Sequence, residues 1–518
     1  MKFGFFFGAG AEVSYGLPLG GKFAIDLFRQ DNSAEKEALR SILEDDIDRT
    51  SPYATNWLPE GFFRKRIHAF GKTEFRALIE SSIEYRRHII SERLNALDDL
   101  FERAVEKCGI TVERVSEAFA EHTNRTFGEH TYSQTIKINP TLTNNLKLFE
   151  SEFYSAVLDL VRGEGDTAQI EKYATSILQL LIGAYGQELV QKVNQEIFTE
   201  APDDLTIFDD ISGMFRLEFD KIGNTALELL LKSGAACELE DDATVHDIFL
   251  AVLREILELL FTEILDYQAL IDNYWRYLYS PKEDWAKFTK MVIFLNTTRS
   301  YIQSQLDANF APEADGYYHD LLALLDAGHE ISGIGTANYN NLIQRIAGDR
   351  IPDELVYHLN GGVRDFYNPY KNTVITCADG VPPTDQIHVP FMLTQSGVKP
   401  LTSISMSRRY VELFDKLKQA DVVVAIGYNF NVDDNHINGL FRQLIEDEGR
   451  TFVWIKPKSR QTENQLKKEL EEKMRLPTSA RDRVHIIQVH RDTRQFEQQT
   501  SWIDEIVQRV DGAEPDPA

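Results

Sequence analysis

A short apolar run at the start of the chain most constrains the fold. Residues 1–7 read Met-Lys-Phe-Gly-Phe-Phe-Phe and stop at Gly8, as a buried strand of a parallel sheet does before a turn into a helix. One strand leaves both of its edges unpaired, so it cannot form a domain alone. Hardly any strand-like pattern follows before about residue 330. The first strand is therefore expected to join a sheet built from the C-terminal part of the chain.

The middle of the chain has the pattern of long amphipathic helices. The clearest predicted helices cover residues 76–107, 142–161, 170–198, 245–279 and 285–306. In the fourth of them, apolar residues cover much of the helix circumference. This pattern predicts a helix that lies at the centre of its bundle or packs on another subunit.

After about residue 330 the pattern returns to alternating strands and helices. Strands are predicted at 331–336, 355–359, 373–376, 422–426, 452–455 and 485–489, and helices at 339–347, 408–420, 437–446 and 496–510. The succession predicts an α/β fold, a Rossmann-like doubly wound parallel sheet with a large all-α insertion. The expected parts are the first strand, turn and helix (1–32), the helical insertion (33–325), the rest of the sheet domain (326–510) and a disordered tail (511–518).

Composition narrows the function classes. A length of 518 residues allows two or three domains, and a net charge of −27 disfavours direct nucleic-acid binding. The three cysteines lie far apart without a C-x-x-C pair, which excludes a zinc ribbon. The longest apolar stretch, 248–265, contains four charged residues and is too charged to span a bilayer, so a cytoplasmic protein without a membrane segment is expected.

Four segments at predicted strand ends carry polar residues or glycines, and each has a structural alternative. Gly8-Ala9-Gly10 suits a backbone that approaches a pyrophosphate, or an ordinary tight turn. Residues 335–342 hold asparagines that could face a ligand or cap the next helix. Residues 356–362 contain a histidine that is either structural or catalytic, and residues 426–437 could contact ribose or phosphate, or form a capped helix start.

Together, in this order and spacing, the four segments resemble the sirtuin-like NAD-binding domain, and in particular the divergent bacterial branch that acts in anti-phage defence. Gly8, Ala9, Gly10 and the triplet 16–18 fit the first motif of the family, although Glu12 stands where serine is usual. The segment 336–340 is similar to the T-x-N-hydrophobic-D motif, with asparagine in the last position.

Later segments follow the family less closely. Asn360 stands before Gly361, where the family has its catalytic histidine, and His358 on the same face of the strand is the expected substitute. Gly427, Tyr428 and the residue after it are similar to the segment that contacts the cofactor ribose.

The resemblance implies roles for individual residues. Asn338 would position water or the ribose hydroxyls, and His358, or with less support His436, would act as the base. The remaining expected NAD-binding residues are Gly8, Ala9, Gly10, Ser14, Thr336, Asn360, Gly427, Tyr428 and Asn429.

Without cysteines for the zinc ribbon of the deacylases, the resemblance points to an NAD hydrolase that uses no metal and releases nicotinamide together with ADP-ribose or a cyclic form of it. Such an activity needs control, so the helical insertion is expected to mediate homo-oligomerisation or contact with a sensor protein, unless it is a rigid cap on the cleft. The alternative function is a non-enzymatic subunit that binds NAD or ADP-ribose. A deacylase or ADP-ribosyl transferase ranks third, because no acceptor groove is identified.

Overall fold

The computed structural model describes two compact units. The described residues are 1–18, 20–135, 137–138, 147–162, 167–185, 198–200, 225, 228–231, 239–240, 242–265, 268–309, 315–393, 403–431, 434–459, 461–497 and 500–511. Unit 1 comprises Met1–Leu19, Gln30–Ala69 and Gln268–Ala518, and unit 2 comprises Gly20–Arg29 and Phe70–Tyr267. These bounds differ from the expected 1–32, 33–325 and 326–510. Of the tail expected at 511–518, Asp511 is the last residue of a helix, and residues 512–518 lie outside the described residues.

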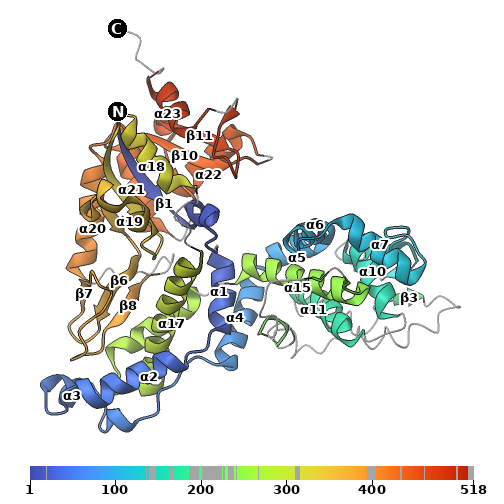
Figure 1. Ribbon diagram of the computed structural model, residues 1–518, viewed down its shortest axis with the longest axis horizontal. Helices are drawn as coiled ribbons and strands as arrows, with labels where there is room; N and C mark the ends of the chain where they lie inside the picture. Colours follow the sequence, from blue (N-terminus) through green and yellow to red (C-terminus); the bar gives the residue numbers. More distant parts are fainter. Residues whose placement is uncertain are drawn as a thin grey trace. The chain divides into compact units, whose positions relative to one another are not determined.

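Unit 1 is built on a six-stranded sheet in which every neighbouring pair is parallel (Figure 1). Its strands are β1 (Lys2–Phe7), β4 (Glu330–Thr336), β5 (Val356–His358), β9 (Val422–Ile426), β10 (Thr451–Pro457) and β11 (Val484–Val489). The order across the sheet is β11-β10-β9-β1-β4-β5. Renumbered by position in the chain, this order is 6-5-4-1-2-3. The expected α/β class with a parallel sheet is confirmed.

The first strand lies at the centre of this sheet. Phe7 of β1 is in register with Ile426 of β9 on one side and with Thr336 of β4 on the other. All five residues from Phe3 to Phe7 are buried. The pairing confirms the expectation that the N-terminal strand joins the C-terminal sheet. A strand this apolar needs a partner on both edges and a cover on both faces.

Helices cover both faces of the sheet. On one face, Phe3, Phe5 and Phe7 pack with α18 (Tyr317–Asp326), α19 (Leu342–Ala347) and α23 (Trp502–Asp511). On the other face, Phe6 packs with α20 (Ile404–Leu417), α21 (Asn435–Glu446) and α22 (Glu463–Met474). Successive strand residues point to opposite faces, so the run of phenylalanines contributes to both cores.

A second sheet in unit 1 was not expected from the sequence. It is antiparallel, with β6 (Gly361–Asn368) between β7 (Thr373–Thr376) and β8 (Val389–Met392). The prediction that 373–376 belongs to the parallel sheet is therefore wrong. Only two residues separate β5 from β6, whereas a parallel crossover needs about a dozen or more, so the chain turns away into a hairpin meander.

The turn after β1 also differs in detail from the expectation. It continues into a 3-10 helix, η1 (Ala9–Tyr15), before α1 (Gly20–Arg29) begins. Unit 1 further contains α2 (Ser33–Ser41), α3 (Pro52–Trp57), α16 (Gln268–Trp275) and α17 (Trp285–Asn309).

Unit 2 is a helical bundle around α15 (Val245–Ile264). Its other main helices are α1, α4 (Lys72–Tyr85), α5 (Arg87–Asn95), α6 (Leu97–Lys107), α7 (Val112–Thr123), α10 (Glu152–Val161) and α11 (Ala168–Tyr185), with a short pair β2 (Lys137–Ile138) and β3 (Phe198–Glu200). Helix α15 is buried on most of its circumference and packs on α1, α5, α6, α7 and α11. Its expected place at the centre of a bundle is confirmed.

Two of the predicted helices are shorter than expected. The helix predicted at 76–107 is interrupted at Arg86 and Ala96, whose ψ angles of 24° and 47° are not helical, and the helix predicted at 245–279 ends at Ile264. Much of the helix predicted at 170–198 lies outside the described residues.

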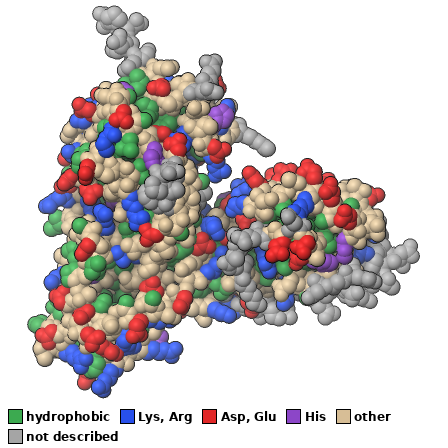
Figure 2. All heavy atoms as spheres, viewed as in Figure 1, with side chains coloured by type: hydrophobic (Ala, Val, Ile, Leu, Met, Phe, Trp, Pro, Cys, Tyr) green, Lys and Arg blue, Asp and Glu red, His purple; other side chains and the backbone are tan. Residues whose placement is uncertain are grey.

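The two signs of charge are mixed on the face of the molecule that Figure 2 shows. Acidic side chains gather on the upper surface of unit 2, whereas Lys and Arg side chains are scattered and form no continuous basic area in this view. None of the helices within the described ranges is both long and apolar enough to cross a membrane.

Candidate functional site

The carboxyl ends of four strands bring the predicted segments to one edge of the sheet. β1 runs into Gly8, β4 into the segment after Thr336, β5 ends at His358, and β9 runs into Gly427. The strand order changes direction between β1 and β9, because β4 and β5 were added on one side of β1 and β9 on the other. In open α/β sheets, ligands bind beyond the carboxyl ends of strands at such a switch point.

Two glycine turns pack against each other at this switch point. A Cβ atom on Gly8 would lie 2.6 Å from the carbonyl oxygen of Gly427, and one on Gly10 would lie 2.9 Å from the Cα atom of Gly427. Gly427 itself has φ of +69°, and a Cβ atom there would meet the amide nitrogen of Ala11. The glycines are therefore needed for the close approach of the two turns.

The same contact occupies two amides that the sequence assigned to a pyrophosphate. The N–H of Gly8 donates to the carbonyl of Ile426, and the N–H of Gly10 donates to the carbonyl of Gly427, both at 2.9 Å. Ala9 begins the 3-10 helix, where the first amides have no partner within the helix. The amide of Ala9 thus stands at the start of this helix, between two glycine amides that are already engaged.

A buried hydrogen-bond network joins η1 to the end of β4 and to α18. The carboxyl of Glu12 accepts from Tyr318 OH at 2.7 Å and from Asn340 Nδ2 at 2.6 Å. Tyr318 OH also accepts from Asn338 Nδ2, at 3.4 Å. All four side chains are at most 9% exposed. Asn338, the expected catalytic asparagine, therefore donates to Tyr318, and Tyr318 donates to the carboxyl of Glu12.

Burial changes the ionisation of this network. It raises the pKa of Glu12 to about 6, against hydrogen bonds from Tyr318, Asn340 and Asn338 that favour the ionised carboxylate. The pKa of Tyr318 is raised well above its ordinary value by burial and by the neighbouring carboxyl. Tyr318 therefore keeps its proton over the whole range in which Glu12 titrates.

His358 lies directly against the backbone of Asn338. Its Nδ1 atom is 3.0 Å from the carbonyl oxygen of Asn338, and its Nε2 atom is 3.2 Å from Nε2 of Gln344. A carbonyl oxygen only accepts, so the proton belongs on Nδ1, and the lone pair of Nε2 accepts from the Gln344 amide. Burial lowers the pKa of His358, which keeps the ring neutral.

Two further predicted residues have structural bonds in the same loop. Thr336 Oγ1 donates to the carbonyl of Phe7 and accepts from the amide of Asn338, at 3.2 and 3.0 Å. Asn360 is 1% exposed, and its Nδ2 donates to the carbonyl of Ala337 at 3.3 Å. These two side chains shape the loop that presents Asn338.

The residues predicted after β9 form a separate cluster. Tyr428 donates a hydrogen bond to the buried carboxyl of Asp434, whose other oxygen is 3.5 Å from Nε2 of His436. Asn429 is exposed and accepts from Lys456 Nζ at 2.9 Å. The structure thus places Tyr428 inside the core and leaves only Asn429 of this pair in reach of a ligand.

Ser14 is the predicted residue that lies apart from this network. It is exposed on η1, and its hydroxyl lies beside Gly316, where a Cβ atom would be 2.7 Å from Oγ. No hydrogen bond of its side chain to the site residues occurs within the described residues.

Sequence reasoning missed the two residues that organise the site, Glu12 and Tyr318. A glutamate between Ala11 and Val13 in an otherwise apolar turn could have indicated a buried carboxyl. Tyr318 gave no such signal, because it belongs to an amphipathic helix whose position over the turn is a tertiary fact.

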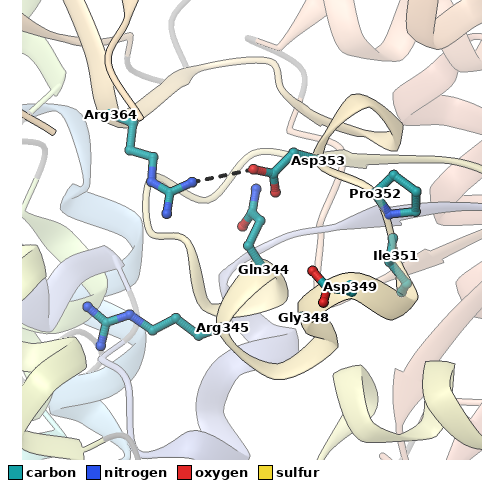
Figure 3. Close-up of a pocket in the computed structure, with 8 residues that line it drawn as sticks. All are labelled: Gln344, Arg345, Gly348, Asp349, Ile351, Pro352, Asp353 and Arg364. Atoms are coloured by element: carbon teal, nitrogen blue, oxygen red, sulfur yellow. Dashed lines mark ion pairs between the residues drawn. The ribbon is translucent and has the colours of Figure 1, made fainter. Parts of the chain in front are cut away.

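Gln344, which contacts His358, also lines a pocket. The pocket has a volume of about 470 Å³ and is lined by Gln344, Arg345, Gly348, Asp349, Ile351, Pro352, Asp353 and Arg364. Figure 3 shows the Gln344 side chain amid the lining residues, near the ion pair of Arg364 with Asp353 at 3.6 Å. The Oε1 atom of Gln344 is buried and has no hydrogen-bond partner among the described residues.

Within the described residues, no group of three or more His, Cys, Asp or Glu side chains is arranged to hold a metal ion. The chain matches no protein-family model, no curated protein and no solved structure.

Proposed function

We propose that this protein binds NAD at the carboxyl edge of its parallel sheet and hydrolyses it to nicotinamide and ADP-ribose. The observation that carries the proposal is the contact of His358 with Asn338 at the ends of β5 and β4, beside the glycine turns at the switch point. An amide side chain and a neutral imidazole are thereby combined at the place where α/β sheets bind ligands.

The strand order supports a dinucleotide as the ligand. In chain order the sheet reads 3-2-1-4-5-6, which is the order of doubly wound dinucleotide-binding sheets, and the first strand ends in a glycine turn in both cases. The Rossmann-like character of the sheet and the resemblance of the four segments to the sirtuin-like domain agree with this choice. The amide of Ala9 would donate to the pyrophosphate.

The chemistry requires few groups. The bond between ribose C1′ and the pyridinium nitrogen breaks, its electron pair stays on nicotinamide, and a water oxygen bonds to C1′ while its proton passes to a base. Asn338 would hold the water or a ribose hydroxyl, and His358 would take the proton on Nε2 after Gln344 moves aside. Its tautomer is set for this role, because the Asn338 carbonyl keeps the proton on Nδ1.

The test is release of nicotinamide from NAD by the purified full chain without a protein acceptor. Asn338→Ala should lose at least about 100-fold in rate, since it removes a polar contact to the reacting groups. Asn341→Ala is the matched control, because this asparagine is three positions away and its side chain makes no capping hydrogen bond. Bound but intact NAD in the wild type contradicts hydrolysis.

A second candidate function has an observation in its favour. Both ring nitrogens of His358 are hydrogen-bonded within the protein, and the amides of Gly8 and Gly10 donate to neighbouring carbonyls. A subunit that binds NAD or ADP-ribose and passes a signal to a partner fits this fully bonded site. Binding without nicotinamide release would identify it.

Control by assembly or by a sensor protein in an anti-phage defence system completes the proposal. The apolar circumference of α15 is covered by helices of its own unit, so it no longer argues for a partner subunit. The remaining support is the size of the helical part and the need to keep an NAD hydrolase silent. Light scattering on the full chain, with and without NAD, tests assembly, and a monomer under every condition contradicts it.

A further inference from the structure

Glu12 is a buried carboxyl that pairs with no cation in the part of the chain that the structure describes. It is 4% exposed, and it forms no ion pair with any lysine, arginine or histidine of the described residues. Taking a carboxyl out of water is costly unless hydrogen bonds replace the lost hydration. The hydrogen bonds that Glu12 accepts must therefore offset the cost of its burial.

Those hydrogen bonds lead to the two asparagines after β4. One oxygen of Glu12 accepts from Asn340 Nδ2, and the other accepts from Tyr318 OH. An ionised carboxylate only accepts, so the tyrosine must donate to it. The lone pairs of the tyrosine oxygen are then left for Asn338 Nδ2.

This chain of donors fixes the orientation of the Asn338 amide. With Nδ2 directed toward Tyr318, Oδ1 of Asn338 is available to accept from a water or hydroxyl. A flipped amide would place Oδ1 next to a tyrosine oxygen whose only hydrogen already points to Glu12. The flip therefore loses a hydrogen bond and sets two acceptors against each other.

We propose that Glu12 is a positioning residue which, by its own contact with Asn338 and through Tyr318, holds the Asn338 amide in its working orientation, and that protonation of Glu12 releases this orientation. The inference rests on the proposed role of Asn338 in the NAD site. A protonated Glu12 has a donor of its own, so Tyr318 is no longer required to donate to it, and both orientations of Asn338 become possible.

The surroundings of Glu12 leave few other groups that could titrate in its place. From α18 it faces Tyr318, which keeps its proton; from the segment after β4 it faces two asparagines, which do not titrate. On η1 itself, Tyr15 accepts from the amide of Tyr318 and contacts the His319 ring, and burial raises its pKa. The charges of Arg494 and Asp320 interact electrostatically with Tyr15, and these two residues form an ion pair with each other.

Burial places the titration of Glu12 at a pKa of about 6. The site would therefore be ordered at neutral pH and would loosen in mildly acidic conditions. His358 can also contribute a pH dependence, so the test separates the two groups.

The first measurement does not depend on activity. The protein is labelled with 15N-asparagine, and the side-chain amide signal of Asn338, identified by its loss in Asn338→Ala, is followed from pH 5 to 8. In the wild type it should shift with a midpoint near pH 6, and in Glu12→Gln it should not titrate. Glu330→Gln, at an exposed glutamate at the start of β4, should behave as the wild type. An Asn338 signal that is constant with pH in the wild type, or titrates unchanged in Glu12→Gln, overturns the inference.

The second measurement uses turnover. Tyr318→Phe and Glu12→Gln should each lower kcat for nicotinamide release about tenfold or more while KM for NAD changes less than about threefold, because an interaction needed mainly in the transition state is weakened. The part of the acidic limb with a midpoint near pH 6 should be lost in Glu12→Gln, and only the part that His358 contributes should remain. Wild-type kcat in both variants contradicts the inference, whereas an inactive wild type with a titrating Asn338 signal contradicts only the proposed hydrolase function.

Discussion

The imidazole of His358 donates from Nδ1 to the carbonyl oxygen of Asn338, 3.0 Å away, so that the end of β5 is bonded to the loop after β4. Asn360 occupies the position in which the resembling family has its histidine. Its Nδ2 atom donates a similar hydrogen bond to the carbonyl of Ala337. His358 and Asn360 thus both hold the same loop, and the second ring nitrogen of His358 accepts from Gln344.

If His358 is the base, its removal should affect turnover rather than binding. His358→Ala is expected to lower kcat for nicotinamide release by about 100-fold or more, the usual contribution of general base catalysis. NAD affinity, measured by calorimetry, should stay within about threefold of the wild type. His490→Ala, at an exposed histidine, serves as control. A large loss of affinity with unchanged kcat would assign His358 to binding instead.

Gln344 should restrain His358. Gln344→Ala removes the donor to Nε2 and admits water to the ring, so the pKa of His358, which burial lowers, should rise. The measurement is the pH titration of the imidazole signals of His358 by NMR in both proteins. An unchanged or lower pKa in the variant shows that burial by other side chains controls the ring.

Because the two glycine turns touch, an alanine at Gly427 should lower the free energy of unfolding by more than backbone strain alone. Gly61 has φ of +64° with open space around it, so Gly61→Ala should cost only the conformational penalty, about 1–2 kcal/mol. Gly427→Ala adds a collision with the amide of Ala11 and should cost about 3 kcal/mol or more. Both glycines belong to unit 1, and thermal unfolding of the two variants compares them. Equal destabilisation would mean that the turns separate easily.

Glu12 should make unit 1 less stable at neutral than at acidic pH. Its pKa in the folded protein is raised from 4.5 to about 6, so the protonated form stabilises the fold below pH 4.5, and this contribution is lost as the pH rises through 6. The size is about 2 kcal/mol, from about 1.4 kcal/mol per pKa unit. The free energy of unfolding of the wild type relative to Glu12→Gln should fall by this amount between pH 4.5 and 7. A constant difference contradicts the raised pKa.

A buried ion pair joins α20 to the antiparallel sheet. Arg409 donates to both oxygens of Asp365 at 2.7 and 2.6 Å, and the aspartate side chain is 5% exposed. Arg409→Met leaves this carboxylate buried and unpaired, and should destabilise unit 1 by about 3 kcal/mol or more in chemical unfolding. Arg408→Met, at the exposed neighbouring position, should be within about 0.5 kcal/mol of the wild type.

Much of the sheet could be predicted because its strands are apolar on both faces. The run 422–426 was placed with correct bounds, and the strands ending at Thr336 and Val489 were placed within one residue at their starts. The antiparallel sheet could not be separated from the parallel one, because β7 is four residues long and carries no sign of its partner. The antiparallel direction of the second sheet follows from the two-residue link between β5 and β6. This link can be recognised only when the bounds of both strands are known.

The site was predicted less completely than the fold. Asn338 and His358 lie together as the pattern of strand ends suggested, since residues at the carboxyl edge of neighbouring strands are close in space. The engagement of the Gly8 and Gly10 amides could not be predicted, because it depends on how closely the β9 turn approaches. The place of Tyr318 over Glu12 depends on packing across about 300 residues of chain and has no local signal.

The central position of β1 has a consequence for the order of folding. Lys2 pairs with Glu330, so at a synthesis rate of about 5–20 residues per second, β1 waits roughly 15–65 s for its first neighbour. Throughout this time, a phenylalanine-rich strand with two open edges is exposed to other chains. Unit 2 has all its residues before β4 and can form its core in the interval. The growing chain thus carries an aggregation-prone segment unpaired during this interval, and we expect its yield to depend on a chaperone that covers the first ten residues.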